Sequence, residues 1–331
     1  MGRALSGTVL TILATAGRGE GRGHLARALA LAEAAHEERV PCVIALLRGE
    51  PSAAERRRAQ AAGATFESPE ALRRRFAPLV VDLPDPNEAG PAVLGRATVF
   101  DDRQVLASPA RFVVQPSLPS WTPAPGAGAG RALIGYAFAP LGQSVLRVIG
   151  ERRPRPPRRE SADPRVLLCY GGSDPHDVTA RLGVALAADP RWALDVVVGP
   201  DYRGAAEARG LAVVREPPDL AERLAAADVA VLGAGTMKFE AAALGTPAIL
   251  VAVADDQVPV GPPFAATGAA AWAGDGRDVD PAFVVELLAA LALDPPRRAA
   301  MASRGREVVP GDGARRIVAA TMTGIGTEGA D

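Results

Sequence analysis

The chain has 331 residues, of which 48% are hydrophobic, and its formal net charge is −1 at pH 7. This length fits two domains, each with a core of its own. The balanced charge argues against a nucleic-acid-binding protein, which would carry a basic excess, and no apolar stretch reaches the ~18 residues of a membrane span.

Residues 17–23, GRGEGRG, join a predicted buried strand (8–16) to a predicted amphipathic helix (24–38). A helix N-terminus presents free N–H groups and a positive dipole end, and glycine lets the backbone approach an anion closely. We therefore expect a ligand-facing loop that ends at His24. Two other interpretations stay open: a purely structural turn, and a dinucleotide fingerprint, although the G-x-G-x-G-x-G spacing differs from G-x-G-x-x-G.

Strands and helices alternate through the rest of the first half. Strands are predicted over 41–47, 76–84, 96–102 and 111–117, and a helix over 52–63. Such alternation builds a parallel sheet covered on both faces, with ligands beyond the carboxyl ends of the strands. Asp82, Asp101 and Asp102 lie at such ends and are candidate sugar-facing residues. The alternative for each is a turn or a helix cap.

The pattern restarts after a proline-rich, charged segment that predicts a linker over 150–164. Strands are predicted within 165–170, 193–199, 211–216, 228–235 and 247–253, with helices between them. The fold class is therefore α/β, with two doubly wound, Rossmann-like domains facing each other across a cleft. We expect an N-terminal domain over 1–149, a nucleotide-binding domain over 165–310, and a C-terminal helix and tail over 311–331 that packs back on the N-terminal domain.

The second half contains two further glycine turns. In YGGSDPHD (170–177), Gly171 and Gly172 allow close approach of a ligand, and Ser173 or Asp174 is expected to cap the next helix. In the stretch 233–257, Gly235 and Thr236 open a helix and predict a phosphate site.

Three side chains near this second turn predict contacts with a sugar nucleotide. Glu240 lies one turn into the helix, where its carboxylate can accept two bonds from a ribose diol. Asp256 and Gln257, in ADDQ at the next strand end, are expected to face the sugar. Lys238, the only lysine, is predicted to contact the ligand or the facing domain, unless it is a surface lysine.

Three segments, GRGHLARALALA, VLLCYGGSDPHDVT and AGTMKFEAAALGTPAILVAVADDQ, together resemble the PseG/SpsG-like UDP-sugar hydrolase family of pseudaminic acid synthesis. That family is related to GT-B glycosyltransferases, and the similarity runs through nearly the whole chain in the same order. It implies a GT-B-like fold, a UDP-sugar substrate, no cofactor and no metal, with His24 as the base for water attack at the anomeric carbon. The implied substrate- and nucleotide-binding residues are Gly21, Gly23, Arg27, Gly171, Gly172, Ser173, Gly235, Thr236, Glu240, Asp256 and Gln257.

The chain also departs from that family's pattern. Asp256 replaces an amide, no tyrosine follows Asp82, and an arginine is missing from YAFAPLG (136–142). The leading hypothesis is a hydrolase that releases UDP from an amino or deoxy sugar. The alternatives are a GT-B glycosyltransferase, in which His24 deprotonates an acceptor hydroxyl, and an inactive nucleotide-sugar-binding protein.

Two cysteines bear on the location of the protein. Cys42 and Cys169 lie far apart in apolar runs without metal-ligand spacing, which predicts buried thiols in a reducing, cytoplasmic compartment. The N-terminal MGRALS matches a myristoylation pattern, and ATAG resembles a signal-peptidase site. Cleavage there would remove the strand that carries the glycine loop, so a cytoplasmic protein is expected. Nothing in the sequence predicts the oligomeric state.

Overall fold

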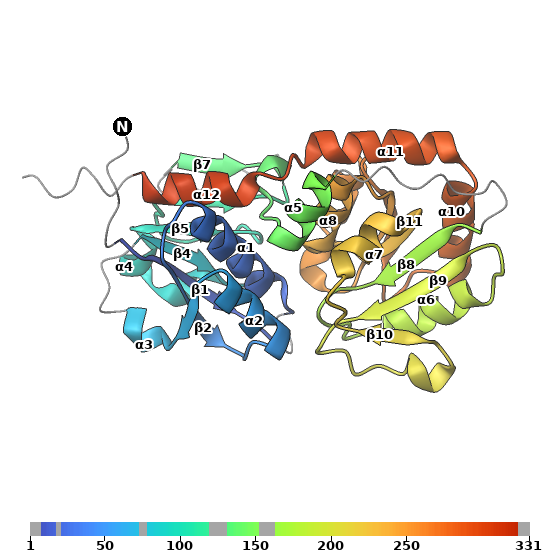
Figure 1. Ribbon diagram of the computed structural model, residues 1–331, viewed down its shortest axis with the longest axis horizontal. Helices are drawn as coiled ribbons and strands as arrows, with labels where there is room; N and C mark the ends of the chain where they lie inside the picture. The colour runs from blue at the N-terminus through green and yellow to red at the C-terminus, as the bar shows by residue number, and fades with distance from the viewer. Residues whose placement is uncertain (1–7, 18–20, 73–77, 119–130, 152–162, 324–331) are drawn as a thin grey trace, which may run out of the picture. The chain divides into compact units, whose positions relative to one another are not determined.

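The computed structural model describes residues 8–17, 21–72, 78–118, 131–151 and 163–323. The chain divides into two compact units, Met1–Gln143 together with Gly311–Asp331, and Ser144–Pro310 (Figure 1). Most of the predicted linker falls outside the described residues. The division lies six residues before the predicted domain end at 149, and Arg147 beyond it pairs with Glu222 of the second unit.

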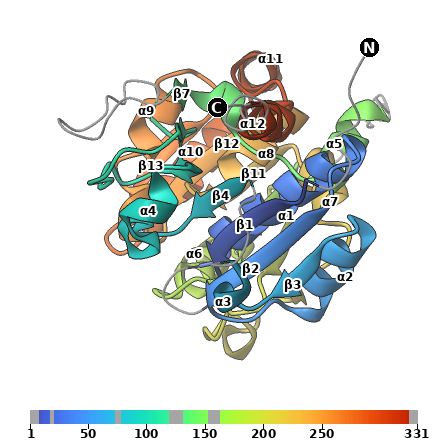
Figure 2. The ribbon, with the colours of Figure 1, turned by 90° about the vertical axis from the view of Figure 1, so that its left-hand side faces the viewer.

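The described part of the first unit contains a parallel sheet of seven strands, in the order β3-β2-β1-β4-β5-β6-β7. Figure 2 shows β3, β2, β1 and β4 in this order. The strands are β1 (Leu10–Thr15), β2 (Cys42–Arg48), β3 (Thr65–Glu67), β4 (Leu79–Asp82), β5 (Ala97–Phe100), β6 (Phe112–Gln115) and β7 (Arg131–Ile134). The order runs outward from β1 in one direction and then restarts at β4 on its other side. A crevice for ligands opens at such a reversal, outside the carboxyl ends of the two strands.

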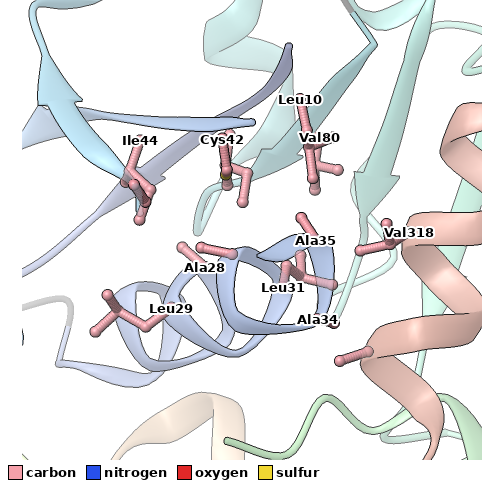
Figure 3. Close-up of a cluster of buried hydrophobic side chains, with 14 of the residues drawn as sticks. Leu10, Ala28, Leu29, Leu31, Ala34, Ala35, Cys42, Ile44, Val80 and Val318 are labelled. Atoms are coloured by element: carbon pink, nitrogen blue, oxygen red, sulfur yellow. The ribbon is translucent and has the colours of Figure 1, made fainter. Parts of the chain in front are cut away.

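The helices of this unit are α1 (Gly23–Glu37), α2 (Ala53–Ala61), α3 (Pro69–Leu72), α4 (Pro91–Leu94), α12 (Gly313–Met322) and the 3-10 turns η1 (Pro86–Ala89) and η2 (Tyr136–Phe138). Successive strand residues point to opposite faces, and both faces of β1 are buried, so its sequence LTILAT is apolar apart from two buried threonines. On one face, α1 packs small side chains against the sheet, which brings the helix close to the strands (Figure 3).

The C-terminal segment belongs to the first unit. Val318 of α12 lies beside α1 in the same core cluster (Figure 3). The hydroxyls of Thr321 and Thr98 lie 2.8 Å apart. A Cβ on Gly313 would lie 2.4 Å from the carbonyl oxygen of Ala139, so the start of α12 has room only for glycine.

Six parallel strands form the described sheet of the second unit, in the order β10-β9-β8-β11-β12-β13. They are β8 (Arg165–Cys169), β9 (Ala193–Val198), β10 (Val213–Arg215), β11 (Val229–Gly233), β12 (Ala248–Ala252) and β13 (Ala271–Asp275). The helices are α5 (Gln143–Gly150), α6 (Val178–Ala187), α7 (Leu220–Ala226), α8 (Met237–Leu244), α9 (Gly261–Ala265), α10 (Pro281–Ala292) and α11 (Pro295–Val308), with 3-10 turns η3 (Glu207–Arg209) and η4 (Asp255–Gln257). The reversal lies between β8 and β11, as it does between β1 and β4.

The predicted fold class of two doubly wound α/β domains is confirmed. The prediction of buried thiols is also confirmed, because Cys42 and Cys169 are unpaired and buried, and burial raises the pKa of each thiol to about 12. Within the described residues, no helix is long and apolar enough to cross a bilayer.

Candidate functional site

His24 lies in the first turn of α1, directly after the glycine loop that follows β1. The loop reverses tightly, because the amide of Gly17 donates to the carbonyl of Gly21 at 3.1 Å. Both glycines have positive φ angles, +115° and +72°, where a side chain would be strained. Gly23 is the first residue of α1, and no side chain caps the N-terminus of this helix. Gly19 falls outside the described residues.

Asp82 ends β4, the neighbour of β1 at the reversal of the sheet. Its side chain is fully buried, and Oδ1 lies 2.7 Å from Nδ1 of His24, whose own side chain is 15% exposed. Parallel strands bring their carboxyl ends to one edge, so two residues 58 positions apart in sequence meet here. The structure thus joins the predicted base to a buried carboxylate.

Arg27, one turn after His24 on α1, also binds this carboxylate. Its Nε and Nη2 donate to the two oxygens of Asp82 at 2.9 and 2.6 Å, and its Nη1 donates to Asp102 at 2.5 Å. The guanidinium also lies 4.7 Å from the ring centroid of Phe100. Together, His24, Arg27, Asp82 and Asp102 form what we call the charge cluster.

The charge cluster fixes the protonation of Asp82. Burial alone would raise the pKa of the Asp82 carboxyl, but the positive charge of Arg27 and the bonds from His24 and Arg27 outweigh burial and lower it. Asp82 is therefore ionised at neutral pH.

This ionised carboxylate also decides the tautomer of His24. Two acceptors would repel at 2.7 Å, so Nδ1 carries the hydrogen and donates it to Asp82. Nη2 of Arg27 also lies 3.1 Å from this Nδ1, and a guanidinium can only donate, but Nη2 already donates to Asp82 at 2.6 Å, so the shorter contact between Nδ1 and the carboxylate decides the tautomer. Among the described residues no group hydrogen-bonds Nε2 of His24, so its lone pair is left to accept a proton.

The three acids of the first unit that are candidate sugar-facing residues each have partners within the unit. Asp82 is fully buried and turned toward His24 and Arg27. Asp101 closes its own loop, because it accepts from the amides of Val105 and Leu106 at 2.9 and 3.4 Å. Asp102 is bound to Arg27.

Arg27, which the family resemblance implies as a substrate-binding residue, lies inside the charge cluster. All three of its guanidinium nitrogens donate within the cluster, and the residue is only 5% exposed. In this structure the guanidinium therefore positions its neighbours.

The loop after β8 contains the first glycine turn of the second unit. Gly171 has φ +83°, and a Cβ on Gly199, at the end of β9, would lie only 2.4 Å from the Gly171 carbonyl oxygen. Two backbones therefore meet here without intervening side chains, with Gly172 and Ser173 half-buried beside them. Asp174 accepts from the amides of Val178 and Thr179 at 3.0 and 2.6 Å, so the helix cap expected of Ser173 or Asp174 is made by Asp174.

The N-terminus of α8, after β11, is different from that of α6. No side chain caps it, and the amides of Gly235, Thr236 and Met237 donate to no other group in the part of the chain that the structure describes. Gln257 packs against this turn: its Oε1 accepts from the Val253 amide at 3.1 Å, and a Cβ on Gly235 would lie 3.3 Å from its Nε2. The open amides form what we call the amide turn, residues 235–237.

Three polar residues around the amide turn complete the predicted set. Glu240 lies half-buried in the first turn of α8, and Asp256 is exposed in η4 beside Asp255, which pairs with Arg277 at 2.8 Å. Lys238 is 2% exposed, so it is not a surface lysine. Its Nζ turns back and donates to the carbonyls just before the helix.

Comparisons with known proteins bear on the fold. No family model and no curated protein sequence matches the chain. One similar solved structure is MurG of Acinetobacter baumannii, which is 14% identical and is matched over 96% of this chain and 99% of that chain, with a TM-score of 0.62. The calicheamicin glycosyltransferase CalG4 is 16% identical over 97% of this chain and 100% of that chain, with a TM-score of 0.61. The spinosyn rhamnosyltransferase SpnG, complexed with thymidine diphosphate, is 18% identical over 96% of this chain and 99% of that chain, with a TM-score of 0.60. The chain has the GT-B fold.

Within this fold, each unit places its candidate residues at the carboxyl edge of its own sheet, at the reversal of strand order. Sequence reasoning identified the positions but missed three pairings: His24 with Asp82, Arg27 with Asp82, and Lys238 with its carbonyls. Among the described residues, no group of three or more His, Cys, Asp or Glu is arranged to hold a metal ion.

Proposed function

We propose that the protein transfers a glycosyl group from a nucleoside-diphosphate sugar, UDP-linked and carrying an amino or deoxy sugar, to an acceptor hydroxyl. The observation that carries this proposal is the 2.7 Å contact between His24 Nδ1 and the buried Asp82 carboxylate. It leaves Nε2 to remove the proton of a nucleophile, which is the requirement for a general base. Likeness to glycosyltransferase structures supports transfer as the reaction.

The base works as a unit with Asp82. When Nε2 takes the proton of the acceptor, the imidazolium that forms is stabilised by the adjacent carboxylate, which itself stays ionised. Arg27 keeps Asp82 in place, since two bonds fix both carboxylate oxygens. The oxygen of the acceptor then attacks the anomeric carbon as the bond to the diphosphate breaks.

The amide turn would receive the departing diphosphate. Amide N–H groups and the positive end of a helix dipole stabilise the negative charge that develops on the leaving group. Glu240 lies one turn into α8, from where its carboxylate would accept bonds from the ribose hydroxyls. Gly171 and Gly172, in the loop after the neighbouring strand β8, would let the backbone approach the same ligand closely.

Hydrolysis is the second candidate function, and it is favoured by the similarity of residues 21–32, 166–179 and 234–257 to the UDP-sugar hydrolase family. In that reaction water replaces the acceptor, while His24 and the amide turn keep the same roles. The two functions therefore differ only in the nucleophile that reaches Nε2.

A screen of UDP- and dTDP-sugars, each with and without glycan and small-molecule acceptors, tests the proposal by measuring released nucleotide. We expect release that requires an acceptor and a product that gains the sugar. Release at the same rate in water alone would replace transfer by hydrolysis. Tight nucleotide binding without any release would contradict both reactions and leave a binding protein.

A further inference from the structure

Lys238 is the only lysine of the chain, and it is buried at 2% exposure in the first turn of α8. Its Nζ donates to the carbonyl oxygens of Ala234 and Gly235 at 2.8 and 3.1 Å. The same ammonium lies 4.1 Å from the ring centroid of Phe239, within the range of a cation–π contact. The lysine thus closes back onto the turn that precedes its own helix.

These bonds orient the amides of the turn. A trans peptide is planar, with its C=O and N–H pointing in opposite directions, and the described residues contain no cis peptide. Because the carbonyls of Ala234 and Gly235 point at Nζ, the N–H groups of Gly235 and Thr236 point away from it. They are two of the three amides of the amide turn, for which no acceptor is found among the described residues.

The position of the charge matters for an anion at the amide turn. A cation in the first turn opposes the helix dipole, and the ammonium is held by two carbonyls behind the turn. An anion on the other side of the amide turn would offset the opposition to the dipole, because it accepts from the oriented N–H groups and is attracted by the charge behind them.

We propose that Lys238 is a positioning residue for the diphosphate of the donor, which it serves by fixing the amide turn and placing a positive charge behind it. This inference rests on the proposed function and assigns the phosphate part of the ligand to a named side chain. The contribution of Lys238 should therefore grow with the number of phosphates on the nucleotide, whereas a lysine that only holds the fold would affect every ligand alike.

Calorimetric titration of Lys238→Met with uridine, UMP and UDP tests this. We expect the affinity for UDP to fall about tenfold, as for loss of a charge-assisted interaction, with UMP intermediate and uridine within about twofold. Glu240→Gln is the matched variant in the same helical turn, and it should weaken uridine and UDP by the same factor. Equal losses for all three ligands in Lys238→Met would overturn the inference.

A second measurement uses the wild-type protein, so that the role of Lys238 can be tested even if the Lys238→Met variant does not fold. With ¹⁵N-lysine labelling, the single Nζ gives one resonance, which should move on titration with UDP and stay in place with uridine. A resonance that ignores UDP, while UDP binds, contradicts the role of Lys238 and leaves the proposed function standing. A wild-type protein that binds UDP no better than uridine would overturn both.

Discussion

The two sheets reverse their strand order at equivalent places but put different chemistry there. At the reversal between β1 and β4, the first unit gathers three charged or titratable side chains, His24, Arg27 and Asp102, around the buried Asp82. Between β8 and β11, the second unit offers glycines and open backbone amides, with one lysine behind them. Topology therefore decides where a ligand can approach, and the side chains decide whether that place handles a proton or an anion.

The helix N-termini differ in a similar way. Those of α1 and α8 have no side-chain cap, whereas Asp174 occupies the first amides of α6. A capped terminus has already satisfied the donors that an anion would use. Of the two helices that follow the strands at this reversal, α6 and α8, it is α8 whose described start has no side-chain cap.

The largest expected effect comes from Arg27→Met. The change leaves Asp82 and Asp102 without their partner in a buried site, which should lower the free energy of unfolding by about 3–5 kcal/mol. Arg56→Met is the matched control, because its pair with Glu50 is exposed and worth about 1 kcal/mol or less. Denaturant unfolding of both variants measures the difference, and equal losses would show that the charge cluster is not a stabilising unit.

The same cluster predicts the sign of a pH dependence. The pKa of Asp82 is lower in the folded state than in the unfolded chain, so its stabilising contribution is present above about pH 4 and is lost as the pH falls further. The free energy of unfolding should fall less steeply with acid in Asp82→Asn than in the wild type. Parallel acid curves would contradict the ionised state assigned to Asp82.

Glu240→Ala should have the next largest effect, a loss of UDP affinity that arises in the second unit. Loss of a carboxylate that accepts from a ribose diol should weaken UDP binding by about 2–3 kcal/mol. A surface glutamate would change affinity by about 0.5 kcal/mol or less. Titration calorimetry with UDP distinguishes the two, and an unchanged dissociation constant would remove Glu240 from the site.

Much of the fold, and part of the site, could be predicted from the sequence. Buried strands such as β11 and β12 are continuous apolar runs, and the glycine turns that follow β1, β8 and β11 mark the carboxyl edges. The edge strands β3 and β7 carry no such signal, because they are short and largely unburied.

The pairings within the site could not be predicted. The sequence shows that Asp82 ends a strand, but its partners lie 55 and 58 residues away and are brought to it by the sheet order. Lys238 is similar: its place in the first turn of α8 is readable, whereas the direction of its side chain depends on the burial that surrounds it. Local patterns fix positions, and tertiary packing fixes what each side chain contacts.

The smallest expected effect contrasts the two kinds of helix start. Asp174→Ala removes the cap of α6 and should cost about 1 kcal/mol of stability. The dissociation constant for UDP should stay the same, because Asp174 serves the helix and not the ligand. Thermal unfolding and calorimetry on one sample check both, and a weakened UDP complex would place α6 in the binding site.

The most direct test of His24 as the general base is the turnover of His24→Asn, with UDP affinity measured on the same protein. If His24 is the base, turnover should fall by about 10²–10⁴, while the dissociation constant for UDP is kept. His36→Asn is the matched control, since His36 is exposed at the other end of α1. A His24→Asn variant that folds and turns over like His36→Asn would contradict the assignment of His24 as the general base.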